Sequence, residues 1–229
     1  MSNKTDKSAN SSGMFLSEIE SKRILKQAGL RVTEPVLAKS REEAVSISRQ
    51  IGFPVVLKIV SADITHKSDS GGVIVGLADA ESVGKSYTGM MSVIRRKHPD
   101  AVIDGISVQK QAPPGVEVII GMTKDPQFGP AVMFGLGGVW VEILKDVSFR
   151  IAPLCQDDAA EMIHELKGYR LLQGYRGKEA VDTAILEDWL LKISRLVEQN
   201  SLIKELDINP IFAYPDGAMA VDARILMEG

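Results

Sequence analysis

The chain has 229 residues, of which 45% are hydrophobic, so it can bury a core as one large domain or as two small ones sharing a cleft. Its 27 basic and 30 acidic side chains leave a formal charge of -3, which argues against a nucleic-acid partner, and no apolar run approaches the ~18 residues of a membrane span. A single cysteine and three histidines exclude an intrachain disulfide and a Cys/His zinc site, and we expect a cytoplasmic protein.

The N-terminal part of the chain predicts a tail followed by helices and short strands. Residues 1–13 are polar and rich in Ser, Asn and Lys, which predicts a disordered tail. Residues 17–29 and 40–52 each begin with the spacing of a capping box and end at a glycine, which predicts two helices. The β-branched runs at 53–60 and 73–77 predict buried strands joined by a polar loop. The two helices therefore flank short extended segments.

Helices and strands also alternate in the rest of the chain. Predicted helices lie at 79–97, 156–167 and 179–199, and predicted strands at 101–111, 116–122, 131–134, 147–152, 203–213 and 218–223. Between two of these strands, the glycine-rich residues 135–138 suit a close backbone approach and are a candidate wall of a ligand cleft. The mixture predicts an α+β (mixed α/β) fold with two subdomains, residues 14–110 and 111–229.

Lys58 lies inside the predicted strand 53–60, between two large apolar residues. Burying an ammonium group is costly without a counter-charge, and the phosphate of a ligand in a cleft would supply one. Alternatively, the alternation of the strand directs this side chain to solvent. On this feature alone the two interpretations are equally supported.

The loop at 61–72 has the composition of a phosphate-binding and phosphate-transferring segment. Its paired glycines, Gly71 and Gly72, can offer backbone N–H groups, and His66 carries an imidazole that can be phosphorylated and return the group. The loop lacks the order of a Walker motif, and an ordinary surface histidine is the simpler interpretation of His66 alone. The other two histidines have no such surroundings, so His66 is the best candidate nucleophile.

A row of polar side chains is predicted on the strand that starts near residue 203. Because residues two apart in a strand face the same side, Glu205, Asp207 and Asn209 share one face. A neighbouring strand carrying Asp222 can bring its carboxylate beside Asn209, and such oxygen ligands suit Mg²⁺ held with nucleotide phosphates. An ordinary solvated strand face is the commoner outcome for this pattern.

Six segments of the chain together carry a family resemblance. They are residues 53–58 (FPVVLK), 64–73 (ITHKSDSGGV), 125–130 (DPQFGP), 133–138 (MFGLGG), 141–147 (VEILKDV) and 205–210 (ELDINP). In combination they resemble the ATP-grasp subunit of ADP-forming acetyl-CoA synthetases over residues 14–227, in the length of its free-standing β subunit. Succinyl-CoA synthetase β subunits are more distantly similar. The resemblance implies an ATP-grasp fold of two subdomains that hold the nucleotide between them.

The resemblance also implies roles for individual residues. The residues that bind ADP or ATP are Lys58, Gly71, Gly72, the adenine-recognising hinge residues Gln109, Lys110 and Gln111, and Glu117 near the ribose or phosphates. Mg²⁺ is held by Asn209 and Asp222, with Asp207 beside them. His66 accepts phosphate from a phosphohistidine of the α subunit and passes it to ADP, which makes His66 and Lys58 the catalytic residues.

The function implied is an enzyme subunit that catalyses the nucleotide half of acyl-CoA + ADP + phosphate ⇌ acid + CoA + ATP. The CoA-binding and acyl-phosphate chemistry then belongs to an α subunit, in an α2β2 hetero-oligomer. Glu18 stands where many ATP-grasp ligases carry a phosphate-binding lysine, which favours the acyl-CoA synthetase branch, and we assign no role to nearby Lys22. The alternatives are a nucleotide-sensing regulatory module and a stand-alone ATP-grasp carboxylate ligase.

Overall fold

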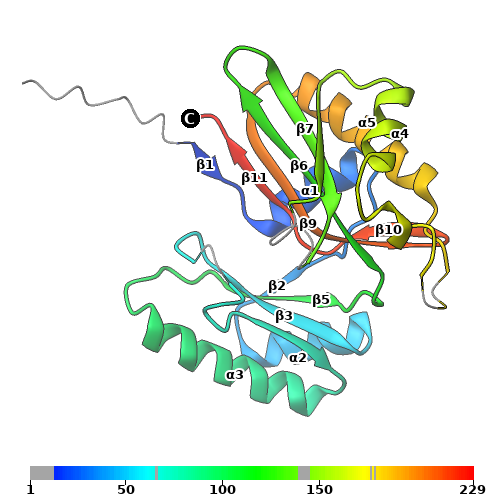
Figure 1. Cartoon of the computed structure of the whole chain (residues 1–229). Helices are drawn as coiled ribbons and strands as arrows, with labels where there is room; N and C mark the ends of the chain where they lie inside the picture. The colour runs from blue at the N-terminus through cyan, green and yellow to red at the C-terminus, as the bar shows by residue number, and fades with distance from the viewer. Residues whose placement is uncertain (1–12, 65–66, 139–144, 176, 178) are drawn as a thin grey trace, which may run out of the picture.

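The computed structural model describes residues 13–64, 67–138, 145–175, 177 and 179–229. Two β-sheets, each with helices on its outer side, form a larger and a smaller lobe that meet at a junction, and helix α1 (Glu18–Gln27) lies beside it (Figure 1). The predicted tail lies outside the described residues, apart from Gly13. No helix in the described ranges is long and apolar enough to span a membrane.

The larger lobe is built on an antiparallel sheet of seven strands. In order across the sheet these are β1 (Met14–Phe15), β11 (Arg224–Met227), β9 (Ile203–Tyr214), β6 (Val116–Asp125), β7 (Gly129–Leu136) and β8 (Val147–Ile151), with β10 (Gly217–Ala220) also paired to β9. Helices α4 (Gln156–His164) and α5 (Thr183–Gln199) cover one face, and a 3₁₀ turn, η2 (Tyr169–Leu171), connects them. The face turned away from α4 and α5 carries the exposed residues of β9.

The smaller lobe is a sheet of four antiparallel strands with its own core. Its order is β2 (Val36–Ala38), β5 (Gly105–Lys110), β3 (Val55–Val60) and β4 (Val73–Leu77). Helices α2 (Arg41–Ile51) and α3 (Ala80–Lys97) pack on the outer face of this sheet (Figure 1). The apolar run of β3 is buried throughout except at its last residue, Val60, as a central strand between β5 and β4 requires.

The α+β class predicted from the sequence is confirmed, and most helices and strands lie where the pattern placed them. The expected boundary at 110/111 falls between β5 and β6, which belong to different sheets. Residues 14–33 differ from the expectation, because β1 pairs with β11 and Leu25 and Leu30 join the core of the larger lobe. The smaller lobe is therefore inserted between two parts of the larger one.

Candidate functional site

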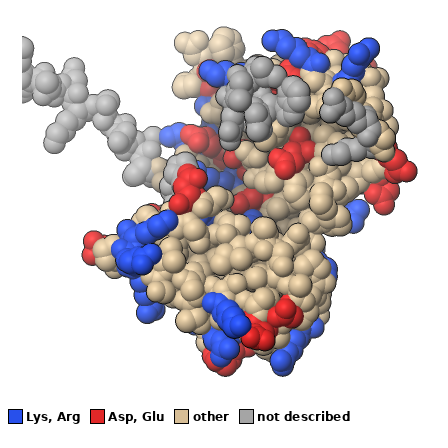
Figure 2. Space-filling view, turned by 60° about the horizontal axis from the view of Figure 1, so that its bottom comes forward, with Lys and Arg blue, Asp and Glu red and all other residues tan. Residues whose placement is uncertain are grey.

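A cleft of about 720 Å³ lies at the junction of the two lobes. The larger lobe contributes Asp207, Asn209, Asp222 and Arg224 to its lining, and the smaller lobe contributes Val60, Lys67, Ser68 and Val73. Figure 2 shows acidic and basic side chains close together at this junction, whereas uncharged residues cover most of the smaller lobe's surface in that view. The cleft is therefore polar and charged on both sides.

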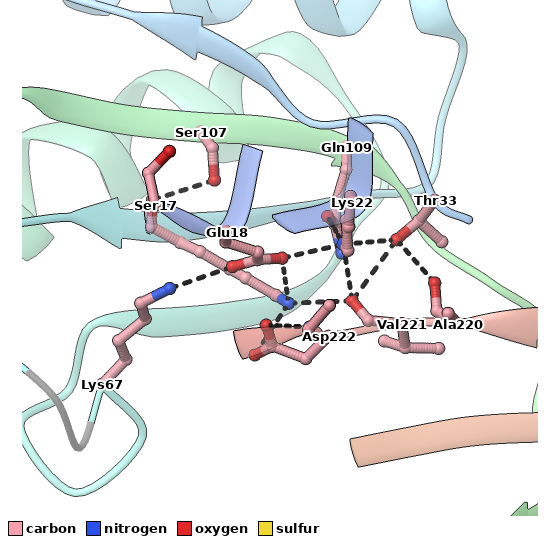
Figure 3. Close-up of polar contacts among 12 residues, drawn as sticks. Ser17, Glu18, Lys22, Thr33, Lys67, Ser107, Gln109, Ala220, Val221 and Asp222 are labelled. Carbon is pink, nitrogen blue, oxygen red and sulfur yellow. Dashed lines mark hydrogen bonds and ion pairs between the residues drawn. The ribbon is translucent and has the colours of Figure 1, made fainter. Parts of the chain in front are cut away.

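At the wall of the cleft, three lysines converge on the carboxylate of Glu18, and Figure 3 labels two of them, Lys22 and Lys67. The Nζ atoms of Lys22 and Lys58 lie 2.8 Å and 2.7 Å from Glu18 Oε1, and Lys67 Nζ lies 3.0 Å from Oε2. Glu18, Lys22 and Lys58 are almost completely buried. A capping box on Ser17 starts α1 at Glu18, so helix capping fixes the position of the carboxylate. We call Glu18, Lys22, Lys58 and Lys67 the Glu18 cluster.

The Glu18 cluster also links the two lobes. Lys22, on α1, donates to three further acceptors, namely Thr33 Oγ1 at 2.8 Å, Gln109 Oε1 on β5 at 2.9 Å and the Val221 carbonyl at 2.7 Å. Lys58, on β3, reaches the same Val221 carbonyl at 3.0 Å and the Asp222 carboxylate at 3.2 Å. Because these donors and acceptors come from both lobes, the cluster holds the lobes against each other.

The pKa values of the cluster show which charges dominate. Burial alone would raise the pKa of Glu18, but the charges of Lys58, Lys22 and Lys67 outweigh it and lower that pKa well below its usual range. Burial lowers the pKa of Lys22 to about 8, although the charge of Glu18 acts in the opposite direction. The like charge of nearby Lys58 adds to the lowering. Burial has the same effect on Lys58, but two carboxylates, Glu18 and Asp222, outweigh it and raise the pKa.

These contacts correct the expected surroundings of Lys58. The carboxylates of Glu18 and Asp222 supply a counter-charge within the protein, and with 4% of its surface exposed Lys58 does not face solvent. Lys58 lies directly behind Asp222, which does line the cleft. Contact between Lys58 and a nucleotide therefore stays a prediction.

The polar row predicted on β9 is present. Glu205, Asp207 and Asn209 are exposed, and they alternate with buried Leu206 and Ile208. The residue before Asp222 donates from its backbone N–H to the Pro210 carbonyl at 3.0 Å, which holds Asp222 near the end of this row. Asp222 itself follows β10 in a loop, not in a strand as predicted, because pairing with β9 ends at Ala220.

Asp207, Asn209 and Asp222 form a donor set that fits Mg²⁺. Desolvation in the cleft and the charge of Asp222 raise the pKa of Asp207 against the opposing charge of Arg224, so the two carboxylates repel each other. Two carboxylates and an amide carbonyl are hard oxygen ligands of the kind Mg²⁺ takes together with phosphate oxygens. Across the described part of the chain, no three His, Cys, Asp or Glu side chains form a metal-binding group on their own.

Gly71 and Gly72 have a different role from the one expected. Their backbone N–H groups close the turn, donating to the carbonyls of Ser68 at 3.0 Å and Lys67 at 2.7 Å, and so are not free for phosphate. Gly71 has a φ of +79°, and a Cβ on Gly72 would lie 2.5 Å from Cγ2 of Ile59. Backbone conformation and packing against β3 therefore require these glycines.

The predicted adenine hinge makes its contacts within the protein. Gln109 is buried against Lys22, and Gln111 Oε1 accepts a hydrogen bond from the Gly76 N–H at 2.7 Å. Lys110 Nζ donates to the Gly52 and Phe53 carbonyls at 3.2 Å and 2.5 Å. None of the three residues lines the 720 Å³ cleft, so their contact with adenine stays a prediction.

Glu117 lies at the start of β6, against the glycine-rich residues 137 and 138. Its carbonyl accepts a hydrogen bond from the Gly137 N–H at 2.7 Å, and a Cβ on Gly137 would lie 2.9 Å from the Cβ of Glu117. The glycine at 137 is thus required for close approach of β7 to β6, which is an alternative to the ligand-binding explanation.

Comparison with known proteins assigns the family. A family model described as an ATP-grasp domain matches residues 7–227. The chain is 51% identical over 212 residues to the beta subunit of acetate–CoA ligase [ADP-forming] I from Pyrococcus furiosus, covering 93% of this chain and 91% of the relative. The chain belongs to the ATP-grasp family of ADP-forming acetate–CoA ligase beta subunits.

Two further relatives agree with this assignment and confirm the family resemblance seen in the sequence. This ATP-grasp chain is 44% identical to acetate–CoA ligase [ADP-forming] II from Archaeoglobus fulgidus, but it spans only 30% of that longer polypeptide. It superimposes with a TM-score of 0.91 and 54% identity on the acetyl-coenzyme A synthetase 1 of Ca. Korarchaeum cryptofilum, in complex with coenzyme A, Ca-AMPCP and HgCl⁺. That match covers 93% of each chain.

The predicted nucleophile of this ATP-grasp protein, His66, lies outside the described residues. The residues that flank the undescribed pair 65–66 are placed, with Ile64 buried in the core of the smaller lobe and Lys67 paired with Glu18. The loop is thus fixed to both lobes at positions adjacent to the undescribed pair. A role for His66 stays a prediction.

Sequence reasoning missed the part that Glu18 and Lys22 play in this ATP-grasp chain. Their four-residue spacing on a predicted helix is the signal that could have identified an ion pair. Burial of that pair depends on acceptors 11, 87 and 199 residues further along the chain, which no local pattern reports.

Proposed function

We propose that this chain is the nucleotide-binding subunit of an ADP-forming acyl-CoA synthetase, which forms ATP from ADP and a phosphohistidine. The observation that carries this proposal is the near-full-length similarity to the P. furiosus beta subunit, 93% of one chain against 91% of the other. A charged cleft between two lobes supports it, since phosphoryl transfer depends chiefly on positioning and electrostatics.

The proposal includes a partner chain. The 44%-identical relative from A. fulgidus carries the matching segment as 30% of one polypeptide, which leaves most of that enzyme outside the match. We propose that a separate α subunit supplies the CoA-binding and acyl-phosphate chemistry here, in an α2β2 assembly in the cytoplasm. The acyl group is then selected by the partner.

In the proposed step, His66 carries phosphate as a phosphoramidate and transfers it to ADP. The P–N bond breaks, a P–O bond forms to a terminal oxygen of ADP, and the imidazole takes up a proton, so that atoms and charge balance. Lys67 and Ser68, which follow His66 in the sequence, line the cleft and can donate to the oxygens of the transferring group. Lys58 supports the same region from behind, through Asp222.

Asp207, Asn209 and Asp222 are the residues we propose to hold Mg²⁺. A structure of the K. cryptofilum enzyme contains Mg-AMPPCP, which supports a magnesium-bound nucleotide in this family. When bound, Mg²⁺ neutralises phosphate charge and fixes the orientation of the phosphates. The protein's contribution is to hold two carboxylates close enough to repel each other before the ion arrives.

Radiolabelling tests the proposed function. The chain, assembled with its partner and incubated with ATP labelled at the γ-phosphate, should acquire an acid-labile, base-stable phosphate that His66→Asn abolishes. His164→Gln is the matched control, because among the described residues His164 bonds to the nearby Ala160 carbonyl and Tyr169 hydroxyl. Turnover by the assembled complex with an unlabelled wild-type chain would rule out the relay, and labelling in the absence of turnover would contradict the synthetase assignment.

A further inference from the structure

The cations that line the cleft differ in how many of their hydrogen-bond donors are already used. Lys67 is paired with Glu18 at 3.0 Å. Arg224, on the opposite wall, is exposed, and its side chain makes no hydrogen bond or ion pair with any residue in the described ranges. Its guanidinium contacts the ring of Phe15, and its charge acts on Asp207 from beyond ion-pair distance. The five N–H donors of the Arg224 guanidinium are therefore available to a ligand in the cleft.

The fold determines where Arg224 points. In the antiparallel pair of β11 and β9, Arg224 is directly opposite Asp207, and partners in such a pair project from the same face of the sheet. That face is the one that carries the predicted metal ligands. Arg224 and Asp207 both line the cleft, yet their charged groups are not within ion-pair distance of each other.

Phe15 gives the guanidinium a fixed support. The central carbon of the Arg224 guanidinium lies 3.8 Å from the centre of the Phe15 ring, a cation–π contact. Phe15 belongs to β1 and pairs with Leu226, two residues from Arg224 on the same face of β11. It also lines the cleft and is 44% exposed, so its ring is accessible to the guanidinium. Stacking occupies one face of the planar group and leaves its edge, which carries the donors, free.

The placement of the charges indicates what this edge can bind. Asp207 and Asp222 line the cleft as candidate ligands of a cation, and Arg224 lies opposite Asp207 on the same face, where it can meet the anion that accompanies that cation. Arginine matches phosphate geometry with two parallel hydrogen bonds, which lysine cannot do. A phosphoryl group coordinated to Mg²⁺ at Asp207 would satisfy both sets of charges.

We propose that Arg224, supported by Phe15, binds the phosphoryl group that is transferred in the cleft. This inference rests on the proposed function and names a residue for it that neither the motif pattern nor the family resemblance singled out. Arg224 donates hydrogen bonds to the phosphoryl oxygens, and it forms no covalent bond to phosphorus. The group is contributed either by the terminal phosphate of the nucleotide or by a phosphorylated side chain entering from outside the cleft.

The test combines binding and turnover in the full-length chain. Calorimetric titration with Mg-ADP and with Mg-AMPPCP is performed on the wild type, Arg224→Ala, Arg224→Lys and Phe15→Leu, and kcat and KM are measured after assembly with the partner. Arg224→Ala should reduce kcat/KM by about 10²- to 10³-fold, and Arg224→Lys should recover only part of it. Arg195→Ala, which removes the same charge from an exposed position on α5, should behave as the wild type.

The binding measurements separate the two sources of phosphate. If the nucleotide supplies the phosphoryl group, Arg224→Ala weakens the binding of Mg-AMPPCP more than the binding of Mg-ADP. If the group arrives from outside the cleft, both affinities stay within about twofold of the wild type while turnover falls. The loss caused by Phe15→Leu should vanish in the Arg224→Ala background, as coupling in a double-mutant cycle requires.

Two results overturn the inference, and they are distinct. Arg224→Ala with wild-type binding and turnover would leave the proposed function intact and reduce Arg224 to a surface residue covering Phe15. A wild-type chain that binds neither nucleotide and does not turn over would reject the proposed function, and the role of Arg224 along with it.

Discussion

Two groups of charged residues meet at the junction of the lobes, and they differ in whether their charges are paired within the protein. In the Glu18 cluster the lysines and the carboxylate are all paired at 2.7 to 3.0 Å, and most are buried. On the exposed face of the larger sheet, Asp207 and Arg224 lie opposite each other without an ion pair. The buried group is satisfied by the protein itself, whereas the open group has charges left for a ligand. Asp222 belongs to both, since it contacts Lys58 and lines the cleft.

The difference shows that a charged residue at a cleft is not evidence of ligand binding until its partners are known. Lys58 has the stronger sequence signal, because an ammonium in an apolar strand demands a counter-charge. The fold supplies that counter-charge from Glu18, 40 residues away, and from Asp222. Arg224 has no sequence signal of this kind, yet its side-chain donors are the ones available to a ligand. Three perturbations test this division, and the first has the largest expected effect.

Glu18→Gln should destabilise the chain by about 3 to 5 kcal/mol, because it leaves Lys22 and Lys58 charged and buried without their shared carboxylate. The free energy of unfolding from urea titration measures the effect. Glu81→Gln is the matched control, since Glu81 pairs with Lys85 at 2.6 Å on an exposed helix face and should cost less than about 0.5 kcal/mol. Equal losses in the two variants would mean that the cluster does not hold the lobes together.

A pH titration tests Lys22 of the buried group, which loses its proton more readily than an ordinary lysine because its pKa is lowered to about 8. Between that value and the ordinary lysine pKa, the unfolded chain binds a proton that the folded chain lacks, so this contribution to stability rises with pH. The unfolding free energy of the wild type relative to Lys22→Met should therefore increase by on the order of 1 to 2 kcal/mol from pH 7.5 to pH 9.5. A difference that stays flat or falls over this window would contradict the lowered pKa.

Neutralising one acid of the open group should produce the smallest effect, of opposite sign. Asp207→Asn removes the repulsion with Asp222 and should stabilise the ligand-free chain by less than about 1 kcal/mol after solvent screening. The same substitution should weaken the binding of the Mg-nucleotide complex. Asp222→Asn should weaken Mg-nucleotide without any gain in stability, because Asp222 also pairs with Lys58 at 3.2 Å. Thermal unfolding and calorimetry on the same preparations check both halves. A stabilised Asp222→Asn, or an Asp207→Asn with wild-type affinity, would remove the distinction between the two acids.

The sequence predicts those features that depend on neighbouring residues. The capping box at Ser17 and the period-two alternation of β9 are local patterns, and both are present in the structure. The strands β1, β2 and β11 contain two to four residues each, too few to give a periodic signal, and they exist because a longer strand offers its edge. Asp222 could be placed near Asn209 by hairpin reasoning, but its loop conformation could not.

The site itself was predictable to the extent that its residues share a strand. Asp207 and Asn209 were found together because they are two apart on β9. The partners of Gly71 and Gly72 were not predictable, because their N–H groups are used by carbonyls within the loop. Likewise, the placement of Arg224 over Phe15 joins opposite ends of the chain through the pairing of β1 with β11.

That pairing of β1 with β11 has a consequence for covalent continuity. The chain enters the smaller lobe after residue 33 and leaves it at residue 110, so both connections to further sequence, on the side of β1 and on the side of β11, emerge from one edge of the larger sheet (Figure 1). A polypeptide fused at either end is attached to the larger lobe alone. The smaller lobe is joined to such a fused segment only through the larger lobe, so the two connections near residues 33 and 110 and contacts such as the Glu18 cluster limit its motion.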